Sequence, residues 1–345
     1  MTVRFGLLGA GRIGKVHAKA ISANPGARLV AVADAMEPAA TALSAQYGCA
    51  VRSIEQILQA SDIDAVVICT PTDTHADLIE QFTKAGKAIF CEKPIDLDVE
   101  RVKACLKVVD AEGGTLMVGF NRRFDPHFLA VKAVIDKGEI GTVEMVQIIS
   151  RDPGAPPVDY IKRSGGIFRD MTIHDFDMAR FLLGEEVDSV TAYASNLVDK
   201  AIGAAGDYDS VSVILTTATG KHATISNSRR ATYGYDQRIE VHGSNGAVSA
   251  ENQRPVSIEV ANASGYTRPP LHDFFMTRYT EAYANEISAF VDAVESKSPA
   301  HPSGLDGLIA LALAEAALRS VAEKRTVQVS EVTGALADKS VFQGR

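Results

Sequence analysis

Three ionisable side chains, Lys93, Asp170 and His174, have the types expected of an acid–base site. Lys93 lies between Glu92 and Pro94, directly after an apolar stretch. A lysine at the end of a buried strand is partly removed from water, and it can then donate a hydrogen bond or relay a proton to a bound ligand. We therefore interpret Lys93 as a catalytic residue; the alternative is an ordinary solvated lysine.

The segment Gly165–Leu182 supplies the second part of this chemistry. If it is helical from about Asp170, then Asp170, His174 and Asp177 are spaced i, i+4 and i+7 and share one face. A histidine beside two carboxylates is suited to act as a general base, and we favour that role for His174. The alternatives are a helix-capping Asp170, a core histidine, or a metal site made by Asp170 and His174, for which the spacing shows no third ligand.

The first residues of the chain predict the scaffold that positions these groups. The apolar run Val3–Leu8 indicates a buried strand, and G-A-G-R-I-G follows it from Gly9 to Gly14. Gly9 would make a tight turn, Gly11 would let the backbone approach a pyrophosphate, and Gly14 would let the next helix pack on the strand. The N-terminus of that helix presents N–H groups and the positive end of its dipole to phosphates. Ordinary turn glycines are the alternative.

Asp34 ends the next apolar run, Leu29–Ala33, twenty residues after Gly14. The dinucleotide-binding fold places at this point the acid that binds the adenosine ribose hydroxyls. A carboxylate there disfavours the 2′-phosphate of NADP, so we predict NAD as the cofactor. A solvated loop acid is the alternative.

Apolar strand-like runs alternate with helical segments through the first third of the chain. The expected strands are Val3–Leu8, Leu29–Ala33, Ala65–Cys69, Ala88–Cys91 and Leu116–Gly119, and the expected helices cover 14–23, 37–47, 54–60, 74–85 and 97–112. This order predicts a doubly wound, parallel α/β sheet, a Rossmann fold. Ligands gather at the carboxyl ends of such strands, where Thr70–His75 and Glu92–Pro94 lie.

The pattern changes from Asn121 onward. Strand-like runs separated by Gly-, Asn- and Ser-rich turns occur at Val143–Ser150, Val187–Asn196, Ser210–Thr217, His222–Ser228, Arg238–His242 and Val256–Val260, with helical segments near 126–137, 281–294 and 305–322. These runs predict an α+β domain with a large, mostly antiparallel open sheet. We therefore expect an NAD-binding domain over 1–120 and a substrate and oligomerisation domain over 121–345, with C-terminal helices that can pack back on the first domain.

Bulk composition excludes several other classes of protein. Lys and Arg number 35 against 43 Asp and Glu, and the net charge of −8 would repel nucleic acids and anionic membranes. The four cysteines, Cys49, Cys69, Cys91 and Cys105, have no C-x-x-C spacing, so neither zinc nor a disulfide framework is indicated. The sequence shows no pattern of a membrane span or a signal peptide. We therefore expect a cytoplasmic enzyme that acts on a small molecule and holds no metal.

Several further polar residues are weaker candidates for the site. Arg123 follows the last expected parallel strand, Asp152 begins a proline-rich loop, and Tyr233 and Tyr235 lie in a polar turn. Such groups at sheet and loop edges are suited to binding phosphate or hydroxyls. Ordinary turns and cross-strand pairs are equally good explanations for each of them.

Taken in order, these motifs resemble the glucose-fructose oxidoreductase / inositol dehydrogenase family over nearly the whole chain. Glu-Lys-Pro together with Asp-x-x-x-His is specific to that family. Within it, the chain is most similar to the bacterial inositol 2-dehydrogenases in the segments 119–125, 150–153, 165–182 and 233–238. One departure is Ser150-Arg151-Asp152, where some inositol dehydrogenases carry His-Arg-Asn, and this loop leaves the preferred polyol open.

The resemblance implies a catalytic trio of Lys93, Asp170 and His174, and a homodimer or homotetramer. It also implies NAD-dependent oxidation of a cyclic polyol, most simply myo-inositol to 2-keto-myo-inositol (scyllo-inosose). The cofactor residues expected are Gly9, Gly11, Arg12, Ile13, Gly14, Asp34, Thr70, Pro71, Thr72, His75, Glu92, Lys93 and Arg123. The substrate residues expected are Lys93, Arg123, Asp152, Asp170, His174, Asp177, Tyr233 and Tyr235. The alternatives are a scyllo-inositol or aldose dehydrogenase, an NAD-dependent glycoside hydrolase, and a non-catalytic NAD-binding sensor.

Overall fold

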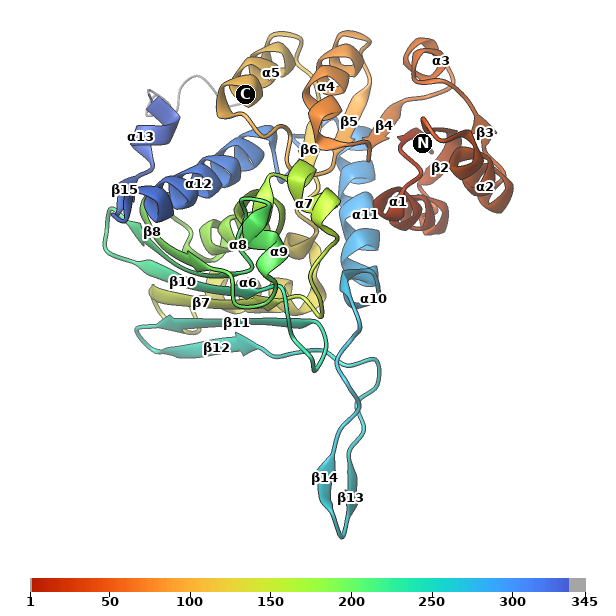
Figure 1. The fold of residues 1–345 in the computed structure, drawn as a ribbon. Coiled ribbons are helices and arrows are strands. Elements are labelled where there is room, and N and C mark those ends of the chain that lie inside the picture. The colour runs from red at the N-terminus through yellow and green to blue at the C-terminus, as the bar shows by residue number, and fades with distance from the viewer. Residues whose placement is uncertain (1, 335–345) are drawn as a thin grey trace. The chain divides into compact units, whose positions relative to one another are not determined.

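The computed structural model describes residues 2–334 of the 345-residue chain. These residues form two compact units (Figure 1). Unit 1 comprises residues 2–124 and 280–311, and unit 2 comprises residues 125–279 and 312–334. The last division between them falls within helix α12 (Gly304–Glu323).

Unit 1 is built on a six-stranded parallel sheet with the strand order β3-β2-β1-β4-β5-β6. Its strands are β1 (Val3–Leu8), β2 (Ala27–Ala33), β3 (Ala50–Val51), β4 (Ala65–Ile68), β5 (Ala88–Cys91) and β6 (Leu116–Val118). Its helices are α1 (Arg12–Ala23), α2 (Glu37–Tyr47), α3 (Ile54–Gln59), α4 (His75–Lys84), α5 (Val99–Ala111) and α11 (Thr280–Ser296). The order of the strands reverses between β1 and β4, which is where such sheets bind ligands. The predicted Rossmann fold is confirmed.

The core of unit 1 joins segments that are far apart in the sequence. Helix α11 packs against α1 and brings Phe290 onto the sheet. The ring of Phe290 lies 6.0 Å from that of Phe5 and 5.8 Å from that of Phe90, between centroids, and all three rings are fully buried. Burial of an aromatic side chain stabilises the folded state by roughly 2–3 kcal/mol, so these contacts fix α11 to the sheet.

Unit 2 contains a seven-stranded sheet in the order β12-β11-β7-β10-β9-β8-β15. Every neighbouring pair is antiparallel except β7 and β10. The strands are β7 (Val143–Arg151), β8 (Val187–Ser195), β9 (Ser210–Thr217), β10 (His222–Ser228), β11 (Asp236–Gly243), β12 (Gly246–Ala250) and β15 (Val327–Gln328). The helices are α6 (Pro126–Asp136), α7 (Val158–Ser164), α8 (Ile173–Leu183), α9 (Lys200–Ala204), α10 (Phe275–Arg278) and α13 (Ser330–Thr333). The predicted mostly antiparallel sheet is confirmed.

The alternation of side chains along these strands gives the sheet two different faces. Helix α8 packs on β7 and β10, and Val146, Ile148 and Ile225 are buried on that side. Tyr193 and Ile214 are exposed. One face of the sheet therefore belongs to the core, and the other carries apolar and polar side chains together.

One expected strand is wrong over most of its length. Residues 256–259 of the run Val256–Val260 are not strand, and their side chains are exposed. A short pair forms beyond them, β13 (Val260–Asn262) with β14 (Gly265–Thr267), in a hairpin that extends away from the seven-stranded sheet (Figure 1). The run alternates apolar and polar residues, as a strand does, but it does not pair with any strand of the seven-stranded sheet.

Candidate active site

The turn between β1 and α1 needs glycine at two of its three glycine positions. Gly9 has a φ of +100°, and a Cβ atom on it would lie 2.4 Å from the carbonyl oxygen of Cys69. A Cβ atom on Gly14 would lie 2.0 Å from the carbonyl oxygen of Gly9. A Cβ atom on Gly11 would meet nothing within 4 Å. Gly9 and Gly14 are thus required by the protein's own backbone, whereas Gly11 borders open space that a ligand can enter.

The open side of this turn is also the N-terminus of a helix. Gly11 is the N-cap of α1 and, as a glycine, provides no side-chain cap, so the first turn of the helix is suited to binding a phosphate. Asp34, at the end of β2, accepts hydrogen bonds from the N–H of Ala10 (2.6 Å) and of Met36 (2.7 Å). A helix N-terminus that suits an anion and a carboxylate at the position predicted to bind ribose hydroxyls therefore lie side by side. These residues fit a dinucleotide.

The polar segments after β4 and β5 are joined by one buried histidine. Nε2 of His75 lies 2.8 Å from the carbonyl oxygen of Thr70, and Nδ1 lies 2.8 Å from that of Pro94. The hydroxyl groups of Thr70 and Thr74 are 2.6 Å apart. Pro71 and Thr72 lie in the short turn between Thr70 and His75. The structure gives His75 a bridging role between the two strand ends, and its contact with the cofactor stays a prediction.

Lys93 follows β5 and is half-buried. Its N–H group lies 3.3 Å from Oε2 of Glu92, and the other carboxyl oxygen of Glu92 lies 2.6 Å from Nε2 of the buried His17. Arg123 forms an ion pair with Asp306 at 3.0 Å. Within unit 1, Lys93 therefore lies just after the carboxyl end of β5. This is the same edge of the parallel sheet as the glycine turn that follows β1, as the sequence predicted.

Asp170 lies in a widened turn and not in a regular α-helix. Residues Phe168–Thr172 form a π-helical segment, and α8 starts at Ile173. Oδ1 of Asp170 accepts a hydrogen bond from the hydroxyl of Tyr160 (2.9 Å), and its Oδ2 lies 3.6 Å from the guanidinium of Arg229. Extra residues in a helical turn are frequent at functional sites, because they redirect side chains without ending the helix.

Arg229 is a residue that sequence reasoning missed. Its side chain is only 1% exposed and also lies 3.7 Å from Oδ2 of Asp207, whose pKa is raised by burial in spite of a hydrogen bond from the N–H of Ile167. A buried arginine between two acids places its positive charge beside both of them and helps to hold Asp170 in position. The one feature of the sequence that could have indicated Arg229 is its position directly after the strand-like run of β10. Arg230 shares this feature and is exposed, so the feature does not distinguish the two residues.

His174 and Asp177 lie on α8, where His174 is half-buried and Asp177 is 1% exposed. The helix is fixed to the sheet by Asn227 of β10, whose Nδ2 donates to Asp175 (2.8 Å) and whose Oδ1 accepts from the hydroxyl of Thr172 (2.7 Å). Both bonds are buried, so they hold the start of α8 firmly. His174 is thereby presented on an element with little freedom to move.

The two tyrosines expected at the substrate have different surroundings. The hydroxyl of Tyr233 accepts from Arg151 (2.9 Å) and donates to Asp236 (2.6 Å), and its ring is 49% exposed. Tyr235 is 6% exposed, and its ring packs edge-on against Tyr279. The geometry gives Tyr235 a place in the core. Contact of either tyrosine with a substrate stays a prediction.

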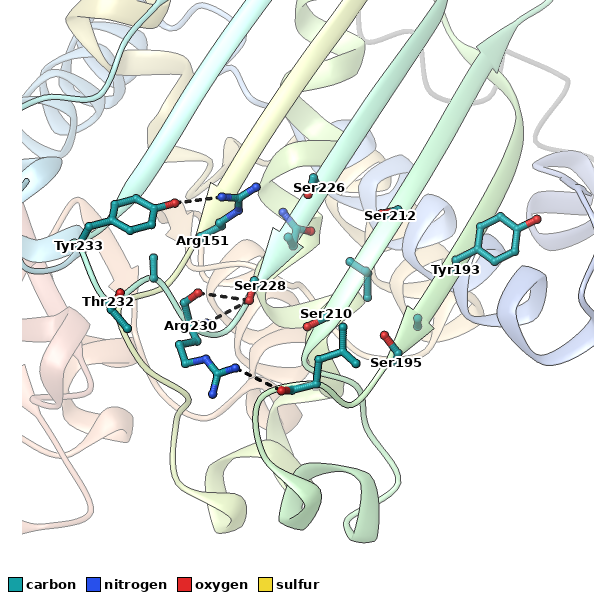
Figure 2. Close-up of a pocket in the computed structure, with 15 residues that line it drawn as sticks. Arg151, Tyr193, Ser195, Ser210, Ser212, Ser226, Ser228, Arg230, Thr232 and Tyr233 are labelled. Carbon is teal, nitrogen blue, oxygen red and sulfur yellow. Dashed lines mark hydrogen bonds between the residues drawn. The ribbon is translucent and has the colours of Figure 1, made fainter.

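A hollow of about 690 Å³ on the sheet of unit 2 has Arg151 and Tyr233 on its wall. Figure 2 shows these two side chains pointing toward each other at one side, with Tyr193 at the other and serines on the strands between them. The wall contains no residue of α8. The hollow is therefore separate from the group of Asp170, His174 and Arg229. Asp152 follows Arg151 and donates its N–H to the carbonyl oxygen of Ser228 (2.9 Å).

Within residues 2–334, no group of three or more His, Cys, Asp or Glu side chains is arranged to hold a metal ion. No helix in the same range has the length and apolar character needed to cross a bilayer.

Comparison with known proteins agrees with this architecture. Residues 3–120 match a family model described as "Oxidoreductase family, NAD-binding Rossmann fold", and residues 128–249 match the GFO/IDH/MocA C-terminal domain. An inositol 2-dehydrogenase of Rhizobium meliloti (strain 1021) is 77% identical over 330 residues, which are 96% of this chain and all of the relative.

Solved structures of relatives have the same fold. A myo-inositol dehydrogenase from Corynebacterium glutamicum is 44% identical with a TM-score of 0.92, covering 95% of this chain and 99% of its own. A scyllo-inositol dehydrogenase from Lactobacillus casei, with bound NAD(H) and scyllo-inositol, is 30% identical with a TM-score of 0.89, covering 96% of this chain and all of its own. The similarity extends over both units, and the chain belongs to the GFO/IDH/MocA family of oxidoreductases.

Proposed function

We propose that this protein oxidises myo-inositol to 2-keto-myo-inositol (scyllo-inosose) with NAD⁺ as the oxidant. The observation that carries the proposal is the 77% identity, over the whole length of the relative, to a protein named inositol 2-dehydrogenase. The glycine turn with Asp34 supports NAD, and the pair of Asp170 and Arg229, together with His174 on the following helix α8, supports acid–base chemistry.

The roles of the residues follow from what the oxidation of an alcohol requires. When bound, NAD⁺ supplies the acceptor for the hydride that leaves the carbinol carbon. His174 takes the proton of the same hydroxyl group, and Asp170 orients the imidazole and stabilises its protonated form. Lys93 donates a hydrogen bond to the hydroxyl oxygen and stabilises the negative charge that develops on it. The products are one ketone, one NADH and one proton.

The direction of the Asp170 carboxyl group depends on the groups that hold it. Tyr160 donates to one carboxyl oxygen and Arg229 faces the other. Both contacts fix the direction of the carboxyl group. A rigid carboxylate can then hold His174 in the one orientation in which the imidazole faces the substrate, which is the contribution expected of an orienting acid.

The assembly and the compartment are further parts of the proposal. We infer a homodimer or homotetramer that pairs through the outer face of the seven-stranded sheet, because Tyr193 and Ile214 are exposed there. All four cysteines are free and buried, which supports a reducing compartment, the cytoplasm. The substrate is a small polyol, and neither a nucleic acid nor a membrane is a partner.

The direct test is a panel of polyols and sugars with NAD⁺, scored by the absorbance of NADH. myo-Inositol should be the best substrate, with scyllo-inositol as the second candidate because the Lactobacillus casei relative binds it. His174→Ala should lower kcat about a hundredfold or more, since it removes the general base. Near-normal turnover by this variant would exclude the role of His174. Release of an aglycone without net NADH would indicate a hydrolase, and no turnover with any polyol would indicate a sensor.

A further inference from the structure

Three ionisable side chains meet inside unit 1, behind the Glu-Lys-Pro segment. They are His17 of α1, Glu92 at the end of β5 and Glu286 of α11. His17 and Glu286 are fully buried, and Glu92 is 9% exposed. Nε2 of His17 lies 2.6 Å from Glu92, and Nδ1 lies 4.0 Å from Glu286. The mechanism above does not use this cluster, and buried ionisable groups are costly unless they have a task.

The charges of the cluster can be assigned from its neighbours. Glu286 faces His17, the negative charge of Glu92 and the thiol of Cys69. In residues 2–334, neither carboxyl oxygen of Glu286 has a hydrogen-bond partner. A second buried negative charge would be uncompensated, so Glu286 keeps its proton. In agreement, burial and then the charge of Glu92 raise the pKa of Glu286 well above its usual value.

Glu92 connects this cluster to Lys93. One carboxyl oxygen takes the hydrogen bond from His17, and the other lies 3.3 Å from the N–H of Lys93. The backbone of Gly119 closes the remaining side, because a Cβ atom there would lie 3.2 Å from the carboxyl carbon of Glu92. The carboxylate of Glu92 is therefore enclosed, and the direction of the next residue in the chain depends on it.

We propose that His17 is a positioning residue for Lys93. His17 holds Glu92, and through it the Lys93 segment, against the helix that carries the glycine turn. Two rings support this orientation, those of Phe90 and Tyr283, at 5.0 Å and 5.6 Å from the imidazole between centroids. The inference rests on the proposed function, since it concerns the catalytic lysine.

The test compares two substitutions of His17 in the full-length protein. His17→Leu fills the space but removes the donor to Glu92, whereas His17→Gln can place an amide nitrogen near the position of Nε2. We expect His17→Leu to lower kcat for myo-inositol about tenfold or more, since a shift of about 1 Å in a catalytic group can cost a hundredfold. His17→Gln should recover kcat to within about threefold of the wild type. The Kd of NAD⁺, measured by calorimetry, should change by less than about threefold in both.

Two results would overturn the proposal. The first is a lower melting temperature in both variants with an unchanged kcat, which means a purely structural role. The second is a loss confined to NAD⁺ affinity, which means that His17 serves the glycine turn alone.

A separate readout keeps the test valid if no polyol is oxidised and the proposed function fails. Lysines carrying ¹³C-methyl groups are followed by NMR, and the Lys93 signal is assigned with Lys93→Arg. His17→Leu should change the chemical shift of the Lys93 signal, because it moves the lysine relative to its surroundings, and His17→Gln should not. An unmoved signal in both variants would exclude a positioning role without reference to turnover.

Discussion

Adding one methyl group at either of two neighbouring glycines should separate folding from cofactor binding. The backbone of Gly11 has φ −69° and ψ −164°, a region open to any residue, and a Cβ atom there meets nothing within 4 Å. Gly11→Ala should therefore change the free energy of unfolding by less than about 1 kcal/mol, because the restriction of the unfolded chain by alanine offsets its weaker N-cap preference. The same methyl group would occupy the space that the pyrophosphate needs.

Gly9→Ala is the matched variant with the opposite outcome. Its φ of +100° is strained for alanine, and its Cβ atom would lie 2.4 Å from the carbonyl oxygen of Cys69. Left-handed backbone costs roughly 1–2 kcal/mol, and forced repacking adds roughly 1–3 kcal/mol. We therefore expect Gly9→Ala to lose about 2–5 kcal/mol of stability in the absence of any ligand.

Thermal and urea unfolding with and without NAD⁺ measure both effects. At 100 times the Kd of the wild type, NAD⁺ should stabilise the wild type by about 2.7 kcal/mol. If Gly11→Ala weakens binding a hundredfold, the same concentration should stabilise that variant by only about 0.4 kcal/mol. Full stabilisation of Gly11→Ala by NAD⁺ would refute the placement of the pyrophosphate at this turn. A ligand-free Gly11→Ala that loses as much stability as Gly9→Ala would contradict the account of its backbone.

Three further changes test other parts of the site. Asp34→Ala removes the carboxylate beside Ala10 and should lower the ratio of kcat/KM for NAD⁺ over NADP⁺ about 10- to 100-fold; a wild type that already prefers NADP⁺ would contradict this. Arg229→Met leaves Asp170 and Asp207 without their buried cation and should lower the free energy of unfolding in urea by about 3–5 kcal/mol. The exposed control Arg230→Met should lower it by under about 0.5 kcal/mol. Equal losses would argue against the ion pairs of Arg229. Glu286→Gln should flatten the pH dependence of stability. In the wild type, the folded state keeps a proton that the unfolded state releases above about pH 4.5, so stability falls as the pH rises from there toward the raised pKa of Glu286. An unchanged slope in the variant would contradict a protonated Glu286.

Much of unit 1 could be predicted because its signals are local. The glycine turn, the buried strands and the polar residues at the strand ends follow one another within short distances, and Ala88–Cys91 was predicted to the residue. The position of α11 was not accessible in the same way. Phe290 meets Phe5 across 285 residues of sequence, and the apolar spacing of a helix gives its buried face but not the partner of that face.

The surroundings of Asp170 in unit 2 show where sequence patterns fail. Arg229 and Arg230 are adjacent and identical in type, yet one is buried between two acids and the other is exposed. Tyr233 and Tyr235 are likewise only two residues apart, yet the first is 49% exposed and the second 6%. The widened turn at Phe168–Thr172 changes the angles that place Asp170, and helical periodicity does not indicate it. In each case the decisive information is a contact with a distant segment.

The Glu-Lys-Pro segment can be explained as a lysine held from both sides. On one side, the carboxylate of Glu92 is fixed by His17 of α1 and enclosed by the backbone of Gly119. On the other side, the carbonyl oxygen of Pro94 lies 2.8 Å from Nδ1 of His75. The Nε2 atom of the same ring lies 2.8 Å from the carbonyl oxygen of Thr70, which follows β4. Lys93 is therefore attached to two different helices through its two neighbours, and adding or removing one residue would take one of these attachments out of reach. This is a physical reason why the tripeptide, and not lysine alone, marks the site in the sequence.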